Sequence, residues 1–82
     1  MTEYKVYLLQ SESNENERYI GISENLENRI KDHNLGNSKH TSKYRPWKLV
    51  AYFTFVDKYK AYEFEKYLKS HSGRAFAAKR FW

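Results

Sequence analysis

Residues 18–34, RYIGISENLENRIKDHN, decide the predicted fold because a strand and a helix follow each other there with one short turn between them. The first five residues favour a strand, since they contain a tyrosine and two isoleucines and are interrupted only by Gly21. Ser23 is suited to cap the helix that follows, and Gly36 is suited to end it in the left-handed conformation that glycine adopts readily. The stretch therefore predicts a strand over residues 18–22 that leads into a helix ending before Gly36.

The apolar face of that helix carries two polar residues. Counted from Leu26, the positions i, i+3, i+4 and i+7 hold Leu26, Arg29, Ile30 and His33. A domain of this size has little stability to spare, so an arginine and a histidine on a buried face need a reason. Arg29 and His33 are therefore the first candidates for a functional site.

Two further segments favour strands. Residues 4–9, YKVYLL, precede a polar, acidic loop, so we expect them to pair with residues 18–22 as an antiparallel hairpin. Residues 48–56, KLVAYFTFV, form the strongest predicted strand because branched and aromatic residues dominate them. Together the three segments predict a small, mostly antiparallel sheet.

Two helices are expected after the third strand. Asp57 can cap a helix that runs to about Ser70, and we expect Gly73 to separate it from a short basic helix over residues 74–80. The predicted order is β-β-α-β-α-α. This order indicates an α+β fold in which helices flank a three-stranded sheet, in one domain over residues 1–82.

The composition of the chain favours a polyanionic partner. The 82 residues carry a net charge of +5, and 18% of them are aromatic. Lysine and arginine neutralise phosphates and aromatic faces stack on bases, so this balance suits a nucleic acid, although solubility alone can explain such an excess. The absence of cysteine excludes disulfides, a thiolate metal site and a cysteine nucleophile.

Neither a membrane span nor a signal peptide is expected. No apolar run is long enough to cross a bilayer, and the first residues, MTEYKVYLLQSES, lack the basic-then-apolar layout of a signal peptide. We therefore expect a cytoplasmic protein without membrane contact.

The helix that follows Asp57 also has a polar residue in its apolar stripe. Counted from Ala61, the stripe includes Glu65, whose carboxylate must then be partly desolvated. Such a group needs a cation, a metal or several hydrogen-bond donors. Two structural alternatives are open: Glu65 forms a buried bridge with Arg29, or the stripe is rotated so that Tyr67 points inward.

Two tyrosines share one face of the predicted hairpin. Side chains alternate along a strand, so Tyr7 lies opposite to Val6 and Leu8, and Tyr19 shares a face with Gly21. If the register aligns them, both tyrosines stand beside Gly21, whose missing side chain leaves a hollow. Packing is the usual role of such tyrosines, but here an arginine, a histidine and a glutamate accompany them.

These residues carry a resemblance to a known family. KVY at residues 5–7, YIG at residues 19–21 and LENRIKDHN after them resemble a GIY-YIG nuclease domain. The likeness is greatest to the short stand-alone bacterial proteins of that superfamily, which are grouped with the nuclease subunit of nucleotide excision repair. RPWKLVAYFTF and AYEFEKYLKS resemble the third strand and the following helix of those proteins, so the match covers about residues 4–73.

The resemblance implies an active site, residue by residue. Tyr7 and Tyr19 correspond to the two motif tyrosines with Gly21 beside them, and Glu65 to the metal-binding carboxylate. Arg29 and a histidine one turn later, His33, complete the implied catalytic set of Tyr7, Tyr19, Arg29, His33 and Glu65. Two departures are visible: the first motif reads KVY instead of GIY, and no asparagine follows Asn37 where many family members have one near the end of the domain.

The implied chemistry is metal-dependent phosphodiester hydrolysis. A single Mg²⁺ or Mn²⁺ held by Glu65 and water would assist the departing oxygen, and Arg29 has a planar fork suited to phosphate oxygens. Tyr7 is the implied general base, so its pKa must be lowered by nearby cations such as the metal, Arg29, Lys43 or His33. Tyr19 would orient water or phosphate.

The basic loop after the first helix is the expected grip on the nucleic-acid backbone. We expect DNA rather than RNA as the partner, and Tyr44 or Trp47 could stack on a base, although core packing is the simpler role for Trp47. The predicted nucleic-acid-binding residues are Gly21, Lys39, His40, Lys43 and Arg45.

Three functions are open from the sequence. The first is a metal-dependent endonuclease, and the complete tyrosine, arginine, histidine and glutamate set favours it. The second is a nucleic-acid-binding module that keeps the GIY-YIG fold with weak or no turnover, which the absent asparagine and the small size favour. The third is a small domain that binds another protein.

Overall fold

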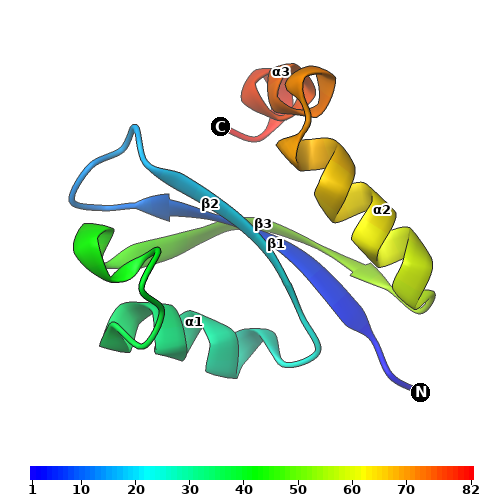
Figure 1. Cartoon of the computed structure of the whole chain (residues 1–82), viewed down its shortest axis with the longest axis horizontal. Helices are drawn as coiled ribbons and strands as arrows, with labels where there is room; N and C mark the ends of the chain where they lie inside the picture. Colours follow the sequence, from blue (N-terminus) through cyan, green and yellow to red (C-terminus); the bar gives the residue numbers. More distant parts are fainter.

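The computed structural model describes all residues, 1–82, and confirms the predicted α+β fold. Three antiparallel strands, β1 (Tyr4–Ser11), β2 (Arg18–Ser23) and β3 (Trp47–Phe55), form one sheet in the order β2-β1-β3 (Figure 1). The strands agree with the predicted segments to within two residues at each end. Because β1 is central, the two other strands each leave one edge of the sheet open.

The central strand divides the core into two parts. Val6 and Leu8 point to one face of the sheet, and Tyr7 and Leu9 point to the other; all four are buried. This follows from the alternation of side chains along a strand, here with both faces covered.

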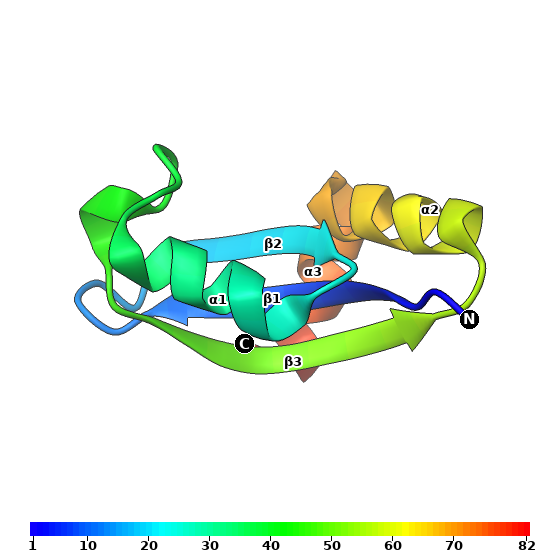
Figure 2. The same ribbon diagram turned by 90° about the horizontal axis from the view of Figure 1, so that it is seen from below.

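Helices cover both faces of the sheet. Helix α1 (Leu26–Leu35) packs on the face of Tyr7 and Leu9, whereas α2 (Lys58–Lys69) and α3 (His71–Arg80) pack on the face of Val6 and Leu8. Figure 2 shows α1 in front of the sheet with α2 and α3 behind it. A short 3₁₀ turn, η1 (Ser42–Tyr44), connects α1 to β3.

The first helix begins later than the sequence predicts. Ser23 is not its N-cap, because β2 continues through this residue, and the Ser23 hydroxyl instead accepts a hydrogen bond from the Asn25 amide at 3.0 Å. Asn25 is the N-cap, and its Oδ1 accepts from the Asn28 amide at 3.2 Å. The predicted stop is confirmed, since Gly36 has φ 82° and its amide donates to carbonyls of the last turn.

The boundary between the last two helices is also corrected. Ser70 rather than Gly73 separates α2 from α3, and the Ser70 hydroxyl caps α3 by accepting from the Gly73 amide at 3.2 Å. Gly73 lies inside α3, where a Cβ would collide with the backbone carbonyl of Tyr67. The glycine therefore lets the two helices approach at a sharp corner; it does not end a helix. The other predicted cap is confirmed, because Asp57 accepts from the amides of Tyr59 and Lys60.

Candidate active site

The two motif tyrosines lie together over Gly21. Tyr7 pairs directly with Gly21 across the β1–β2 ladder, and its ring centroid is 6.1 Å from that of Tyr19. A Cβ at Gly21 would lie 2.5 Å from the Tyr7 hydroxyl oxygen and 2.8 Å from a ring carbon of Tyr19. The hollow expected beside Gly21 is therefore filled by the two rings, and the glycine is buried instead of open to a nucleic acid.

His33 is buried beneath these tyrosines. Its Nε2 lies 3.0 Å from the Tyr7 hydroxyl, and its ring centroid lies 4.8 Å from that of Tyr19. The side chain has no exposed surface, and both ring nitrogens have partners. His33 thus occupies its stripe position as a core residue and contacts the candidate base at the same time.

Thr41 is a site residue that sequence reasoning missed. Its hydroxyl lies 2.7 Å from His33 Nδ1, and the Thr41 side chain is buried. The Thr41 carbonyl accepts a hydrogen bond from the indole of Trp47 at 2.8 Å, which confirms Trp47 as a core residue. Thr41 lies in a polar run, HTSK, with no periodicity, so only the tertiary contact distinguishes it from its neighbours.

Arg29 stands at the open side of the tyrosine pair. Its side chain is 37% exposed and lies 3.8 Å from an Asp32 carboxylate oxygen. Partial burial lowers the pKa of Arg29, but contacts with the hydroxyls of Tyr7 and Tyr19 outweigh it and raise this pKa above its ordinary value. The guanidinium is thus charged, next to both hydroxyls and accessible to a phosphate.

The electrostatics of Tyr7 differ from those expected of a base. Burial, and then the nearby Tyr19, raise the pKa of Tyr7 to about 12, although Arg29 acts in the opposite direction. The predicted lowering of this pKa by Arg29 and His33 is therefore not achieved by the side chains of the protein. Burial and the charge of Arg29 lower the pKa of His33, so this imidazole is neutral at pH 7.

Glu65 approaches from the other side of the sheet. Helix α2 covers the face opposite to Tyr7 and His33. Along β2, Tyr62 shares a small pocket with Ile22, and Leu68 lines a groove with Ile20, so Glu65 lies between these points, alongside the middle of the strand. The structure therefore brings Tyr7, Tyr19, Arg29 and His33 together, and it carries Glu65 on α2, the helix that packs on the opposite face of the sheet.

The two structural alternatives for Glu65 are not observed. Tyr67 is 41% exposed while Ala61 is buried, so the stripe of α2 is not rotated. Glu65 does not bridge to Arg29; its carboxylate accepts from Lys69 Nζ at 3.0 Å, one turn along the same helix.

The basic loop between α1 and β3 is exposed and lies on the same side of the sheet as α1. Lys43 Nζ lies 5.5 Å from the ring centroid of Tyr44, and the guanidinium of Arg45 packs against Gly36. Lys39 and His40 project from the turn between α1 and η1. None of the four side chains forms an ion pair with a carboxylate, so their charges are available to phosphates.

The donor set near Glu65 fits only a strongly hydrated ion. No group of three or more histidine, aspartate or glutamate side chains is arranged to hold a metal. A single, largely buried carboxylate can still hold Mg²⁺ or Mn²⁺ if water fills most of the coordination shell, as these ions prefer. Glu65 is the residue that would do so here, in competition with Lys69.

The fold and the tyrosine-centred site are those of a small α+β domain with a candidate active site, and comparison with known proteins gives its family. Residues 3–79 match the model of the GIY-YIG catalytic domain, and the chain belongs to this family. The solution structure of the UPF0213 protein BH0048 from Bacillus halodurans is similar, with a TM-score of 0.56 and 28% sequence identity, over 94% of this chain and 83% of that one. No curated protein matches the sequence. No helix is both long and apolar enough to cross a bilayer.

Proposed function

We propose that this domain is a metal-dependent endonuclease that hydrolyses phosphodiester bonds in DNA, with Tyr7 as the general base. The observation that supports this proposal best is the hydrogen bond between the Tyr7 hydroxyl and a neutral, buried imidazole, with Arg29 beside it. Any buried hydroxyl needs a hydrogen-bond partner, but Arg29 adds a cation and a phosphate-binding fork directly beside this one.

The buried network gives Tyr7 a route for its proton. With the His33 proton on Nδ1, this nitrogen donates to the Thr41 hydroxyl and leaves Nε2 free to accept from Tyr7. As the Tyr7 oxygen takes a proton from the attacking water, its own proton passes to His33 Nε2. A pKa of about 12 for Tyr7 then becomes compatible with base catalysis, because no free phenolate has to accumulate.

Arg29 and Tyr19 act on the phosphate in this proposal. The guanidinium of Arg29 binds non-bridging oxygens, where negative charge develops as water attacks phosphorus. The hydroxyl of Tyr19, adjacent to Tyr7, orients the water or the phosphate. The phosphorus–oxygen bond on the far side then breaks, and the departing oxygen takes a proton from solvent. His33, whose pKa is lowered by burial, returns its extra proton to the Tyr7 oxygen, and Tyr7 releases a proton to solvent.

Glu65 would hold the divalent ion, Mg²⁺ or Mn²⁺, at the edge of β2. When bound, such an ion supplies positive charge to the departing oxygen. The exposed cations Lys39, Lys43 and Arg45, with His40, would bind the backbone on the α1 side of the sheet.

The second candidate function is a nucleic-acid-binding module with weak or no turnover. The raised pKa of Tyr7 and the pairing of Glu65 with Lys69 favour it, because both disfavour the implied base and metal ligand in the unliganded protein.

Cleavage of labelled nucleic acids distinguishes the two functions. Single strands, duplexes, flaps and branched DNA, with matched RNA, are incubated with the protein and Mg²⁺ or Mn²⁺. We expect metal-dependent products from at least one DNA substrate, and their loss in Tyr7→Phe. Binding without cleavage of any substrate at all would establish the binding module.

A further inference from the structure

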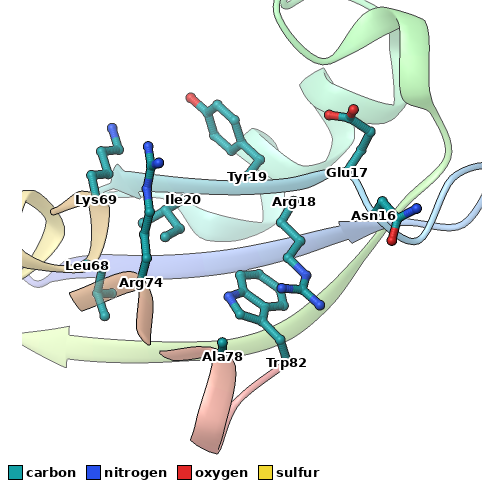
Figure 3. A pocket seen from close by; sticks show the side chains of 10 residues that line it. All are labelled: Asn16, Glu17, Arg18, Tyr19, Ile20, Leu68, Lys69, Arg74, Ala78 and Trp82. Atoms are coloured by element: carbon teal, nitrogen blue, oxygen red, sulfur yellow. The ribbon is translucent and has the colours of Figure 1, made fainter. Parts of the chain in front are cut away.

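A groove with an unusual set of side chains lies beside the free edge of β2. It has a volume of about 570 Å³, within the usual range for ligand sites of about 300–1,000 Å³, and runs between β2, the end of α2 and helix α3. Figure 3 shows its lining, in which Arg18, Tyr19, Lys69, Arg74 and Trp82 supply most of the polar and aromatic atoms. Of these residues, Tyr19 and the Glu65 partner Lys69 belong to the site described above; Arg18, Arg74 and Trp82 do not.

The two arginines of this groove are not neutralised by the protein. Arg18 and Arg74 form no ion pair, and neither side chain donates a hydrogen bond within the chain. Lys69 is paired with Glu65, and Glu17 is the remaining carboxylate of the lining. Two unpaired guanidinium groups on one concave surface indicate an anionic ligand, and phosphates suit their planar forks.

The aromatic side of the groove indicates that the ligand also carries a base. The guanidinium of Arg18 lies 4.9 Å from the centroid of the Trp82 ring. The indole of Trp82 is partly exposed and makes no hydrogen bond, in contrast to the buried Trp47. Arg18 lies over the ring, and Trp82 also packs against the core, so the exposed part of the indole and the guanidinium plane together offer a stacking surface. Bases of single strands stack on such surfaces, whereas the bases of a duplex are covered by their neighbours.

Tyr19 connects this groove to the candidate active site. Its ring packs against His33 at one end, and the same residue lines the groove. In Figure 3 the side chains of Lys69 and Arg74 point in the same direction as the Tyr19 ring, so phosphates bound there would lead toward its hydroxyl.

We propose that this groove binds a single-stranded nucleic-acid segment, with Arg18 and Arg74 on its phosphates and one base stacked on Trp82. Its role as the path of the strand that enters the active site rests on the proposed nuclease function, but the binding itself does not. The groove would make the domain prefer substrates with a single-stranded arm over blunt duplexes.

Quenching of tryptophan fluorescence by an oligothymidylate of eight nucleotides tests the binding directly, without metal and without cleavage. We expect saturable quenching that is lost in Trp82→Phe, because buried Trp47 is the other tryptophan and cannot stack. Anisotropy with a labelled oligonucleotide should show an affinity about tenfold or more lower for the Arg18→Ala/Arg74→Ala double variant.

The control is Lys58→Ala/Lys60→Ala, which removes the same charge from exposed positions at the start of α2. Equal losses in the two double variants, or quenching that survives Trp82→Phe, would overturn the groove. The proposal would also be overturned if a blunt duplex of the same sequence lost as much affinity as the single strand in the Arg18→Ala/Arg74→Ala variant. A protein that binds through the groove but cleaves nothing would remove the nuclease proposal and leave the groove intact.

Discussion

The Tyr7 hydroxyl and His33 Nε2 are 3.0 Å apart in the buried centre of the domain, although 26 residues separate them in the chain. The second nitrogen of the same ring reaches Thr41, so a strand, a helix and a loop meet at one imidazole. The side chains of His33 and Thr41 are buried, so both depend on this network for their hydrogen-bond partners, and Tyr7 links the network to Arg29 at the open side.

Removal of the Tyr7 hydroxyl separates catalysis from structure. Tyr7→Phe should abolish cleavage, and it should lower the free energy of unfolding by about 1–3 kcal/mol because His33 Nε2 loses its partner. Tyr52→Phe is the matched control, since Tyr52 pairs with Tyr7 across the sheet but its side chain is exposed. Cleavage assays and urea unfolding measure both effects. Full activity in Tyr7→Phe would exclude this residue as the base.

The Thr41 hydroxyl should be as important as that of Tyr7 for the tautomer and the hydrogen bonding of His33. Thr41→Val keeps the shape of the side chain but leaves Nδ1 unsatisfied, with an expected loss of about 1–3 kcal/mol of stability. Thr41→Ser keeps the hydroxyl and should retain most of the stability. Nitrogen chemical shifts of the imidazole report its tautomer. If Thr41→Val leaves the tautomer and the pH profile of cleavage unchanged, Thr41 does not position His33.

Replacement of Glu65 tests the metal without a large effect on the fold. Because Glu65 pairs with Lys69 and not with Arg29, Glu65→Gln should change stability only by roughly 0.3–0.5 kcal/mol, the contribution of an i, i+4 pair. It should abolish cleavage and any stabilisation by Mn²⁺. Glu63→Gln, at an exposed position of the same helix, is the control. Thermal melts with and without Mn²⁺ give the result, and a metal effect that persists in Glu65→Gln would place the ion elsewhere.

Stability should be greatest between about pH 7 and pH 10. His33 has a folded-state pKa below 6.5, so the neutral ring favours folding and this stability is lost as pH falls below about 6.5. Tyr7 has a folded-state pKa of about 12 instead of 10.0, so its neutral form favours folding, and about 2–3 kcal/mol is lost as pH rises from 10 toward 12. Urea unfolding across this range measures both arms. Tyr7→Phe should flatten the alkaline arm, and an unchanged arm would contradict the assignment to Tyr7.

Binding of nucleic acid should depend strongly on salt. The exposed cations of the basic loop are unpaired, so replacement of Lys39 or Lys43 by alanine should reduce the slope of log K against log salt by about one unit each if each contacts a phosphate. Anisotropy at several salt concentrations measures the slope. An affinity that hardly changes between low and moderate salt would show that phosphate neutralisation is not the driving force.

Local features of the fold were predictable from the sequence because neighbouring residues produce them. Gly36 ends α1 because its amide hydrogen-bonds to carbonyls of the preceding turn. Asp57 caps α2 because its side chain accepts from amides of the turn that follows. Ser23 and Gly73 were assigned wrongly, because pairing with β1 extends β2 through Ser23 and the packing of α2 on α3 gives Gly73 its role. Both errors arise where a tertiary contact overrides a local preference.

The sequence by itself determined that Tyr19 and Gly21 share one face of their strand and that Tyr7 lies opposite to Val6 and Leu8, because side chains alternate along a strand. The register that pairs Tyr7 with Gly21 is a finding of the structure. Tertiary structure alone decided which face of the sheet α2 covers, since an apolar stripe indicates only that a helix faces a core. It therefore decided that Glu65 is carried by the helix opposite to Tyr7, whereas the ion pair of Glu65 with Lys69 is a local i, i+4 contact within α2. The burial that raises the pKa of Tyr7 is tertiary too, because desolvation comes from all the elements packed around the ring, α1 and the basic loop included.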